Sequence, residues 1–139
     1  DAGHVELGGR VRAGYLAQEG ENLPMEETPL ALCLGVCRDE TRVRTMLACL
    51  KLPAEKILRP LATLSAGERT KAGLAQLLLS GANLLLLDEP TNHLEMEARA
   101  ALEQALCRYP GTVVLATHDE WLAEQIADHL LELGATIEA

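Results

Sequence analysis

The strongest constraint on the fold is a run of four leucines, Leu84–Leu87, which ends in the adjacent acids Asp88 and Glu89. The run shows no alternation of apolar and polar residues, a pattern that is typical of parallel strands covered on both faces. It therefore predicts a buried strand that carries two carboxylates to the edge of a sheet.

Helix and strand patterns alternate around this run. A helix is expected from about Glu68 to Ser80, where Gly81 is a normal C-terminal stop. A further helix up to residue 108 is indicated by one apolar stripe, formed by Leu94, Ala98, Ala101, Leu102, Ala105 and Leu106. A second buried strand is expected at 112–116.

The end of the chain continues the same pattern. Asp119 can cap a helix that runs to about Ala127, and residues 129–133 are expected to form a last strand. Strands that alternate with helices at this spacing predict an α/β fold with a parallel sheet as its core. Residues 65–139 are therefore assigned to one α/β core segment.

The first residues predict a different local structure. Two apolar stretches, 5–7 and 11–16, lie on either side of Gly8-Gly9, which indicates a β-hairpin. A polar loop that contains Gln18 follows, so residues 1–22 are assigned to a hairpin and its loop.

Residues 23–64 predict a small helical subdomain. Thr28 can cap a helix with Pro29 at its first position, and Asp39 can cap a second helix with one apolar face. Pro53 and Pro60 bracket a short third helix.

Four polar side chains follow the predicted strands, namely Gln18, Asp88, Glu89 and His118. Ligands of open α/β sheets bind outside the carboxyl ends of the strands, so these side chains are expected at one edge. Asp88 suits Mg²⁺ held through its water shell, and Glu89 suits an attacking water that it would orient or deprotonate. His118 could donate to a phosphate or hold Glu89, and Gln18 could contact the metal or the water.

A second candidate site stands before the helix at 68–80. Free amide groups and the helix dipole at such a start attract anions, so Ser65, Ala66 and Gly67 form a candidate phosphate site. The same segment also fits an ordinary capping box, in which Ser65 and Glu68 cap the helix reciprocally. Taken alone, these residues leave both interpretations open.

Charge and composition limit the partners. The net charge of −9 argues against direct binding of a nucleic-acid backbone by this segment. No apolar run approaches the ~20 residues that a membrane span needs, and no signal peptide is visible. The chain begins without Met, which indicates a cut fragment.

The four cysteines are Cys33, Cys37, Cys49 and Cys107. Buried free thiols in a reducing compartment are favoured for them over zinc ligands or a disulfide.

The order and spacing of these motifs resemble the nucleotide-binding domain of ATP-binding cassette (ABC) proteins over nearly the whole chain, a partial P-loop NTPase fold. Residues 64–68 resemble the ABC signature, residues 84–88 resemble Walker B, and Gln18 and His118 match the Q-loop and the switch histidine. The sequence of residues 88–94, Asp-Glu-Pro-Thr-Asn-His-Leu, resembles the corresponding motif of the ABC-F subfamily. Members of that subfamily carry two cassettes in one chain and act on ribosomes.

The resemblance implies ATP and Mg²⁺ as cofactors. It implies that Glu89 and His118 are catalytic and that Asp88 and Gln18 lie at the metal. The nucleotide would be contacted by Gln18, Ser65, Ala66, Gly67 and Glu68. The implied partners are a second cassette and, for the parent protein, the ribosome, with a role in translation or in protection from antibiotics and a cytoplasmic location.

Three departures from the family pattern stand out. Ala66 replaces the first signature glycine, and Glu95 replaces the usual aspartate of the D-loop. No Gly-x-x-x-x-Gly-Lys-Ser/Thr P-loop occurs, so the isolated chain is expected to have negligible ATPase activity. Apolar sheet surface left bare by that loss is expected to favour dimerisation or strand exchange.

Three functions fit the resemblance. The first is an ABC-F ATPase that acts on the ribosome. The second is the nucleotide-binding subunit of a membrane transporter, which would couple through the helical segment at 23–62. The third is a non-catalytic interaction module on the ABC scaffold, against which the presence of both Glu89 and His118 argues.

Overall fold

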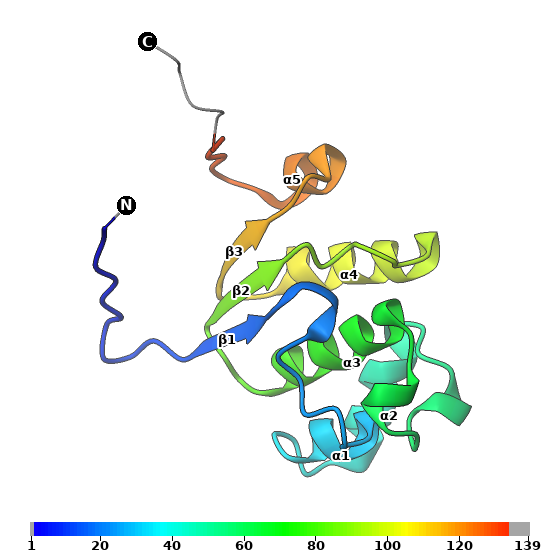
Figure 1. Ribbon diagram of the computed structural model, residues 1–139. Helices are drawn as coiled ribbons and strands as arrows, with labels where there is room; N and C mark the ends of the chain where they lie inside the picture. Colours follow the sequence, from blue (N-terminus) through cyan, green and yellow to red (C-terminus); the bar gives the residue numbers. More distant parts are fainter. Residues whose placement is uncertain (1, 134–139) are drawn as a thin grey trace.

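The computed structural model describes residues 2–133, so the last six residues of the α/β segment predicted at 65–139 lie outside the described part. Figure 1 shows three strands beside a group of helices. The α-helices and strands are β1 (Ala13–Leu16), α1 (Pro29–Leu34), α2 (Glu40–Cys49), α3 (Ala66–Leu79), β2 (Leu84–Asp88), α4 (Met96–Arg108), β3 (Thr112–Ala116) and α5 (Glu120–Ile126). Single 3-10 turns occur at η1 (Gln18–Gly20), η2 (Ala54–Lys56) and η3 (Leu61–Thr63).

The three strands form a parallel sheet in the order β1-β2-β3, which confirms the predicted α/β fold. β2 lies in the centre, with Leu16 of β1 opposite Leu87 and Ala116 of β3 opposite Asp88. All three strands therefore end at the same edge of the sheet.

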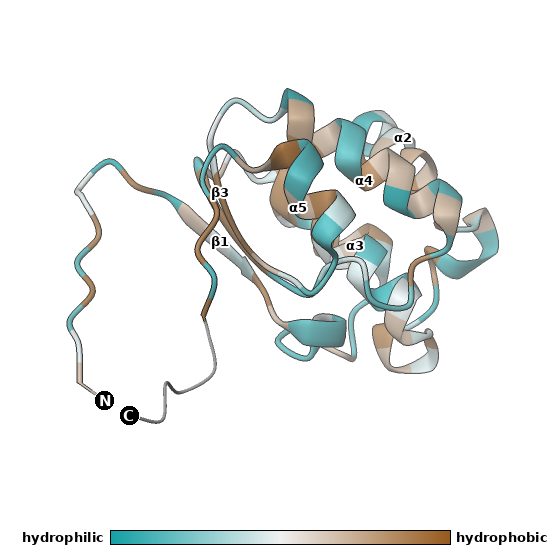
Figure 2. Cartoon of the chain, turned by 90° about the horizontal axis from the view of Figure 1, so that it is seen from above, coloured by the Kyte–Doolittle hydropathy of each residue, from teal (hydrophilic) through white to brown (hydrophobic). Residues whose placement is uncertain are grey.

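Within residues 2–133, helices cover one face of this sheet (Figures 1 and 2). Leu85 and Leu87 are buried on that face. On the other face Tyr15 is 51% exposed and Val114 is 55% exposed. The prediction that the strand at 84–87 is covered on both faces is therefore wrong, because no helix packs on the second face within the described part. The strand at 112–116, which was predicted to be buried, is exposed at alternate positions.

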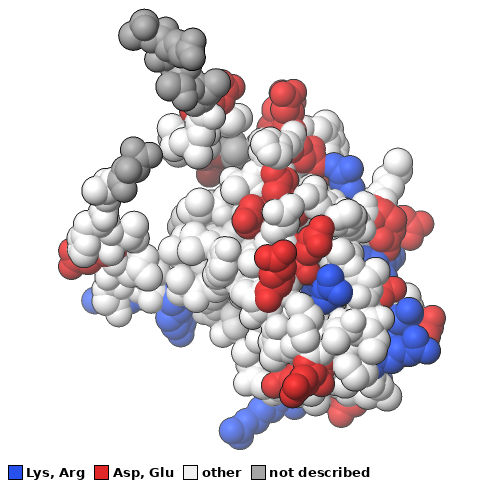
Figure 3. Space-filling view, viewed as in Figure 1, with Lys and Arg blue, Asp and Glu red and all other residues white. Residues whose placement is uncertain are grey.

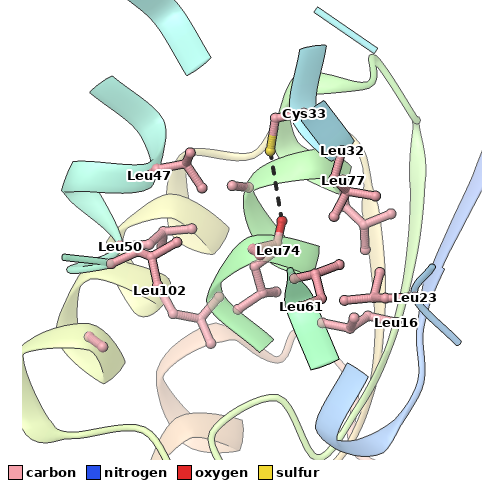
Figure 4. Close-up of a cluster of buried hydrophobic side chains, with 14 of the residues drawn as sticks. Leu16, Leu23, Leu32, Cys33, Leu47, Leu50, Leu61, Leu74, Leu77 and Leu102 are labelled. Atoms are coloured by element: carbon pink, nitrogen blue, oxygen red, sulfur yellow. Dashed lines mark hydrogen bonds between the residues drawn. The ribbon is translucent and has the colours of Figure 1, made fainter. Parts of the chain in front are cut away.

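The chain has no Phe, and its core is built mainly of leucine side chains. These side chains pack around α3. α3 packs against α1, α2, η1 and β1. Figure 4 shows how leucines from different elements meet there: Leu16, Leu23, Leu32, Leu47, Leu50, Leu61, Leu74, Leu77 and Leu102. Full burial of a leucine side chain contributes about 1.5–3 kcal/mol, so this cluster is the main source of stability.

The cysteines differ in burial, and all four are free thiols. Cys33 is buried in the core, with its Sγ 3.9 Å from the carbonyl oxygen of Ala72 (Figure 4). Burial raises the pKa of the Cys33 thiol to about 12, so it stays protonated at neutral pH. Cys49 and Cys107 are exposed, so the expectation of burial is wrong for these two.

The helical subdomain follows the capping signals. The Ala31 amide donates to Thr28 Oγ1 over 3.1 Å, and the Arg42 amide donates to Asp39 Oδ1 over 3.2 Å. Both predicted helix starts are therefore confirmed. The short third helix predicted between Pro53 and Pro60 is found as the single-turn 3-10 helix η2. It stays short because proline has no amide hydrogen to donate to a helix.

The predicted hairpin at 5–7 and 11–16 is wrong. Only a turn forms there, with the Val11 amide 3.0 Å from Gly8 O. The Asn83 side chain binds the chain before β1, accepting from the Arg12 amide over 2.7 Å and donating to Arg10 O over 2.9 Å. These bonds draw the incoming chain alongside β2, so it does not fold back on β1.

The last strand predicted at 129–133 is also absent from the described part. Leu130, Leu131 and Leu133 are exposed, and the sheet ends at β3. The free outer edge of β3 is therefore not joined by residues 129–133. None of the helices in residues 2–133 has the length and apolarity to cross a membrane.

The start of α3 lies against the loop that follows β2. A Cβ atom built on Gly67 would stand 2.3 Å from the carbonyl oxygen of His93. His93 has a positive φ of 61°, and its Nε2 lies 2.9 Å from Glu19 Oε1. The glycine thus lets two backbones approach closely, and His93 connects that contact to the turn η1.

An ion pair between a buried lysine, Lys71, and an exposed glutamate, Glu95, connects α3 to the start of α4. The side chain of Lys71 is only 5% exposed. Its Nζ donates to Glu95 Oε1 and, over 3.1 Å, to Lys51 O in the helical subdomain. Glu95, which departs from the family pattern, therefore satisfies a buried ammonium group within this chain.

Gly67→Ala is expected to lower the free energy of unfolding by roughly 1–3 kcal/mol, because the new methyl group would press on a backbone oxygen. Gly73→Ala in the same helix is the matched control. Its Cβ would lie 2.5 Å from Leu16 Cδ1, the tip of a side chain that can rotate away. Chemical denaturation measures both variants, and a loss for Gly67→Ala no larger than for Gly73→Ala would contradict the proposed close contact.

Glu95→Gln is expected to change how stability depends on pH. The hydrogen bond from Lys71 holds the pKa of Glu95 below its ordinary value of 4.5. A carboxyl with a lowered folded pKa stabilises the fold above its unfolded pKa, and this contribution is lost as pH falls through the folded pKa. The variant should therefore be less stable at neutral pH and lose less stability on acidification below the ordinary value.

Thermal unfolding at about pH 7 and about pH 3 tests this difference. Glu97→Gln, two residues further along the chain and exposed in the first turn of α4, controls for the removal of one negative charge. An acid response in Glu95→Gln equal to that of the unaltered chain would show that the ion pair contributes nothing.

Candidate functional site

The carboxyl ends of β2 and β3 bring Glu89 and His118 together, although 29 positions separate them in sequence. The His118 amide donates to Glu89 Oε2 over 3.3 Å, and His118 Nε2 lies 3.5 Å from Glu89 Oε1. The Glu89 side chain is 13% exposed, whereas the His118 side chain is 99% exposed. The carboxylate is thus held in place while the imidazole stands in solvent.

Local backbone geometry explains how Glu89 reaches this position. Its amide donates to Ala116 O over 2.8 Å, which continues the β2–β3 pairing by one residue. Its φ of 46° lies in the left-handed region, which is strained for a residue with a side chain. The turn directs the carboxylate toward β3 instead of continuing the strand.

The two side chains line a cleft of about 410 Å³, a size within the ordinary range of ligand sites. Its other walls are the loop from Thr91 to Leu94, together with Arg99 and Asp119. All of these residues lie beyond the carboxyl edge of the sheet, where the sequence predicted a ligand.

Asp88 and Gln18 lie at the same sheet edge but do not line this cleft. Asp88 is the last residue of β2 and is half-buried. Gln18 begins η1, directly after β1. The loop around Gln18 is held by Asn22, which accepts from the Ala17 amide and donates to Tyr15 O, and by Arg69, which donates to Glu19 O.

The segment from Ser65 to Glu68 forms the capping box that its sequence allowed. Ser65 Oγ accepts from the Glu68 amide over 3.2 Å, and Glu68 Oε2 accepts from the Ser65 amide over 3.0 Å. These four residues lie outside the cleft of Glu89 and His118. The roles of Ser65, Ala66, Gly67 and Glu68 toward a phosphate therefore remain predictions.

Arg99 contributes a cation to the cleft. The sequence patterns did not identify it as a site residue. Its Nη2 donates to Asp119 Oδ2, and Asp119 Oδ1 accepts from the Leu122 amide over 3.0 Å. The Leu122 amide, together with the Arg99 guanidinium, holds the pKa of Asp119 below its ordinary value. One signal could have revealed Arg99: a cation in the first turn of a helix opposes the helix dipole, so a specific acidic partner is expected.

The donor set fits a Mg-nucleotide better than a protein-only metal cage. No group of three or more His, Cys, Asp or Glu side chains in residues 2–133 is arranged to hold a metal ion. Mg²⁺ usually takes one or two carboxylates and fills its remaining positions with water and phosphate oxygens. Asp88 and the amide oxygen of Gln18 are suitable ligands for such an ion.

Sequence comparison identifies relatives along most of the chain. The family model described as ABC transporter matches residues 8–92. The putative ATP-binding protein YdiF of Bacillus subtilis is 36% identical over 138 residues, which make up 98% of this chain and 22% of YdiF. The ribosome protection protein VmlR of Bacillus subtilis is 34% identical over 95% of this chain and 24% of VmlR.

The energy-dependent translational throttle protein EttA of Mycobacterium tuberculosis is 32% identical over 94% of this chain and 25% of EttA. The chain thus spans about a quarter of the length of these curated relatives.

Solved structures share the fold. The archaeal ribosome recycling factor aABCE1, in complex with the stalk protein aP1, superposes with a TM-score of 0.75 at 24% identity, covering 91% of this chain and 25% of that one. The ATP-binding cassette MJ0796, in a dimer bound to ADP and Pi, superposes with a TM-score of 0.71 at 23% identity, covering 84% of this chain and 56% of that one. With a family match over more than half of its residues, the chain belongs to the ABC transporter family, and the three sequence relatives named above are ABC-F proteins.

Proposed function

We propose that this chain is part of an ABC-F ATPase, which binds and hydrolyses ATP between paired cassettes and acts on the ribosome. The observation that carries the proposal is the contact of Glu89 with His118 across the ends of β2 and β3. Hydrolysis needs a base beside the attacking water and a donor beside the departing phosphate, and these two residue types supply both.

In this reaction ATP with Mg²⁺ supplies the transferable phosphoryl group and the cation that offsets its charge. Asp88 would hold Mg²⁺ through its water shell, and Gln18 would offer its amide oxygen to it. Glu89 orients the attacking water and accepts its proton. The exposed imidazole of His118 donates to a phosphate oxygen, while its backbone amide keeps the Glu89 carboxylate in place.

The turn at Ser65, Ala66 and Gly67 would serve a nucleotide held mainly by the second cassette. The amides at the start of α3 suit an anion, and Glu68 stabilises that start through the capping box. Because the chain contains no Gly-x-x-x-x-Gly-Lys sequence, it offers no cradle of its own for the β- and γ-phosphates. Turnover therefore belongs to the intact protein rather than to these residues alone.

A ribosomal role is supported by two relatives, one named a translational throttle and one named a ribosome protection protein. In this chain 12 basic residues stand against 21 acidic ones. On the face that Figure 3 shows, basic side chains are interspersed with acidic ones. Contact with ribosomal RNA is therefore not assigned to this segment but to other parts of the parent protein.

Glu89→Gln in the intact protein is expected to reduce ATP turnover by about 10²–10⁴-fold, because the amide cannot accept the proton of the attacking water. Steady-state phosphate release measures the loss. Glu97→Gln removes an equal charge from an exposed position of α4 and should leave turnover unchanged. Glu89→Gln turnover equal to that of the control, or robust turnover by the 139-residue chain alone, would contradict the assignment.

The proposed target is tested by co-sedimentation. Glu89→Gln intact protein with Mg-ATP should pellet with ribosomes, because the closed nucleotide-bound state persists when hydrolysis is slow, and high salt should release it. Co-purification with a membrane complex in place of ribosomes would favour the transporter alternative. An intact protein that does not bind Mg-ATP at all would favour a non-catalytic module.

A further inference from the structure

Arg99 makes a contact between elements that the proposed reaction does not by itself require. It lies in the first turn of α4, and its Nη2 donates to Asp119 Oδ2. The Arg99 side chain is 42% exposed and that of Asp119 is 13% exposed, so the pair stands in the wall of the cleft. α4 and α5 also pack against each other, which keeps the two residues in reach.

Asp119 organises the segment that carries His118. Its Oδ1 caps α5 by accepting from the Leu122 amide, and its own amide donates to Thr117 Oγ1 over 2.9 Å. His118 lies between Thr117 and Asp119 in sequence. Its exposed imidazole has Nε2 3.5 Å from Glu89 Oε1. Contacts that hold Asp119 therefore also restrain the backbone of its neighbour His118.

The chemistry of Arg99 suits this task. A guanidinium group is planar, stays charged at all relevant pH values and donates in a fixed geometry. A cation in the first turn of a helix is electrostatically unfavourable, so its place in α4 is explained by the acidic partner on the neighbouring element. The contact runs from α4, on the β2 side of the cleft, to the β3–α5 connection.

We propose that Arg99 is a positioning residue which fixes the 117–119 segment through Asp119 and so keeps His118 within reach of Glu89. The inference rests on the proposed function for its consequence, since a misplaced His118 slows hydrolysis only if His118 takes part in it. It predicts that loss of Arg99 loosens the 117–122 backbone first and lowers turnover second.

Hydrogen exchange of the nucleotide-free intact protein tests the first step without relying on activity. In Arg99→Ala the amides of His118, Asp119 and Leu122 should exchange about fivefold faster, the scale expected for a partly exposed ion pair. Arg99→Lys should restore part of the protection, because it keeps the charge but not the planar fork. Arg108→Ala, in the last turn of the same helix, controls for charge and should leave these amides unchanged.

Turnover tests the second step. Arg99→Ala should lower kcat while the KM for ATP stays the same, and its effect should not add to that of Asp119→Asn. Unchanged exchange at 118–122, exchange that is equally fast in Arg108→Ala, or acceleration that extends to α3 would overturn the positioning role. Faster local exchange with an unaltered kcat would overturn it as well.

These outcomes are separable from a failure of the proposed function. If Glu89→Gln leaves ATP turnover intact, the ATPase assignment fails, whatever the exchange rates are. If Glu89→Gln abolishes turnover while Arg99→Ala changes neither exchange nor kcat, only the positioning role fails.

Discussion

The parallel pairing of β2 with both of its neighbours is the constraint on which the candidate site depends. Leu87 is paired with Leu16 on one side and with Leu115 on the other, so the three strands end together. The loops that follow them carry Gln18, Glu89 and His118 to one edge. A shift of one residue in either register would turn the buried leucines toward solvent, and this energetic cost keeps the polar residues in place.

α3 is the element that joins the helical subdomain to this sheet. Its small residues allow close packing, with Gly73 against Leu16 and Gly67 against the backbone of His93. Its buried Lys71 bonds to the subdomain through Lys51 O and to the start of α4 through Glu95. These contacts of α3 thus connect the subdomain to the loop that precedes α4.

Backbone strain is found beyond the carboxyl edge of the sheet, at Glu19, Glu89 and His93, and in the helical subdomain at Lys51. Within the described residues, the non-glycine positions with positive φ are Glu19, Lys51, Glu89 and His93. Such a conformation costs roughly 1–2 kcal/mol for each residue, so each needs a compensating contact. His93 pairs with Glu19, the Glu89 amide bonds to Ala116 O, and Lys51 O accepts from Lys71. Strained residues are common where a fold positions functional groups.

The sequence by itself determined the α/β class, the strands at 84–87 and 112–116, the helix starts at Thr28, Asp39 and Asp119, and the meeting of Glu89 with His118. These features depend on local hydrophobic patterns, on capping residues and on the rule that parallel strands share one functional edge. The capping box at Ser65 was one of two interpretations that the sequence left open.

Tertiary structure decided the features that depend on residues distant in the sequence. A local pattern does not specify which backbone and side-chain groups from other elements will lie within bonding distance. It replaced the expected hairpin with bonds from Asn83, left residues 129–133 outside the sheet, and left one face of the sheet uncovered within the described part. It also brought Arg99 to Asp119 and Lys71 to Glu95.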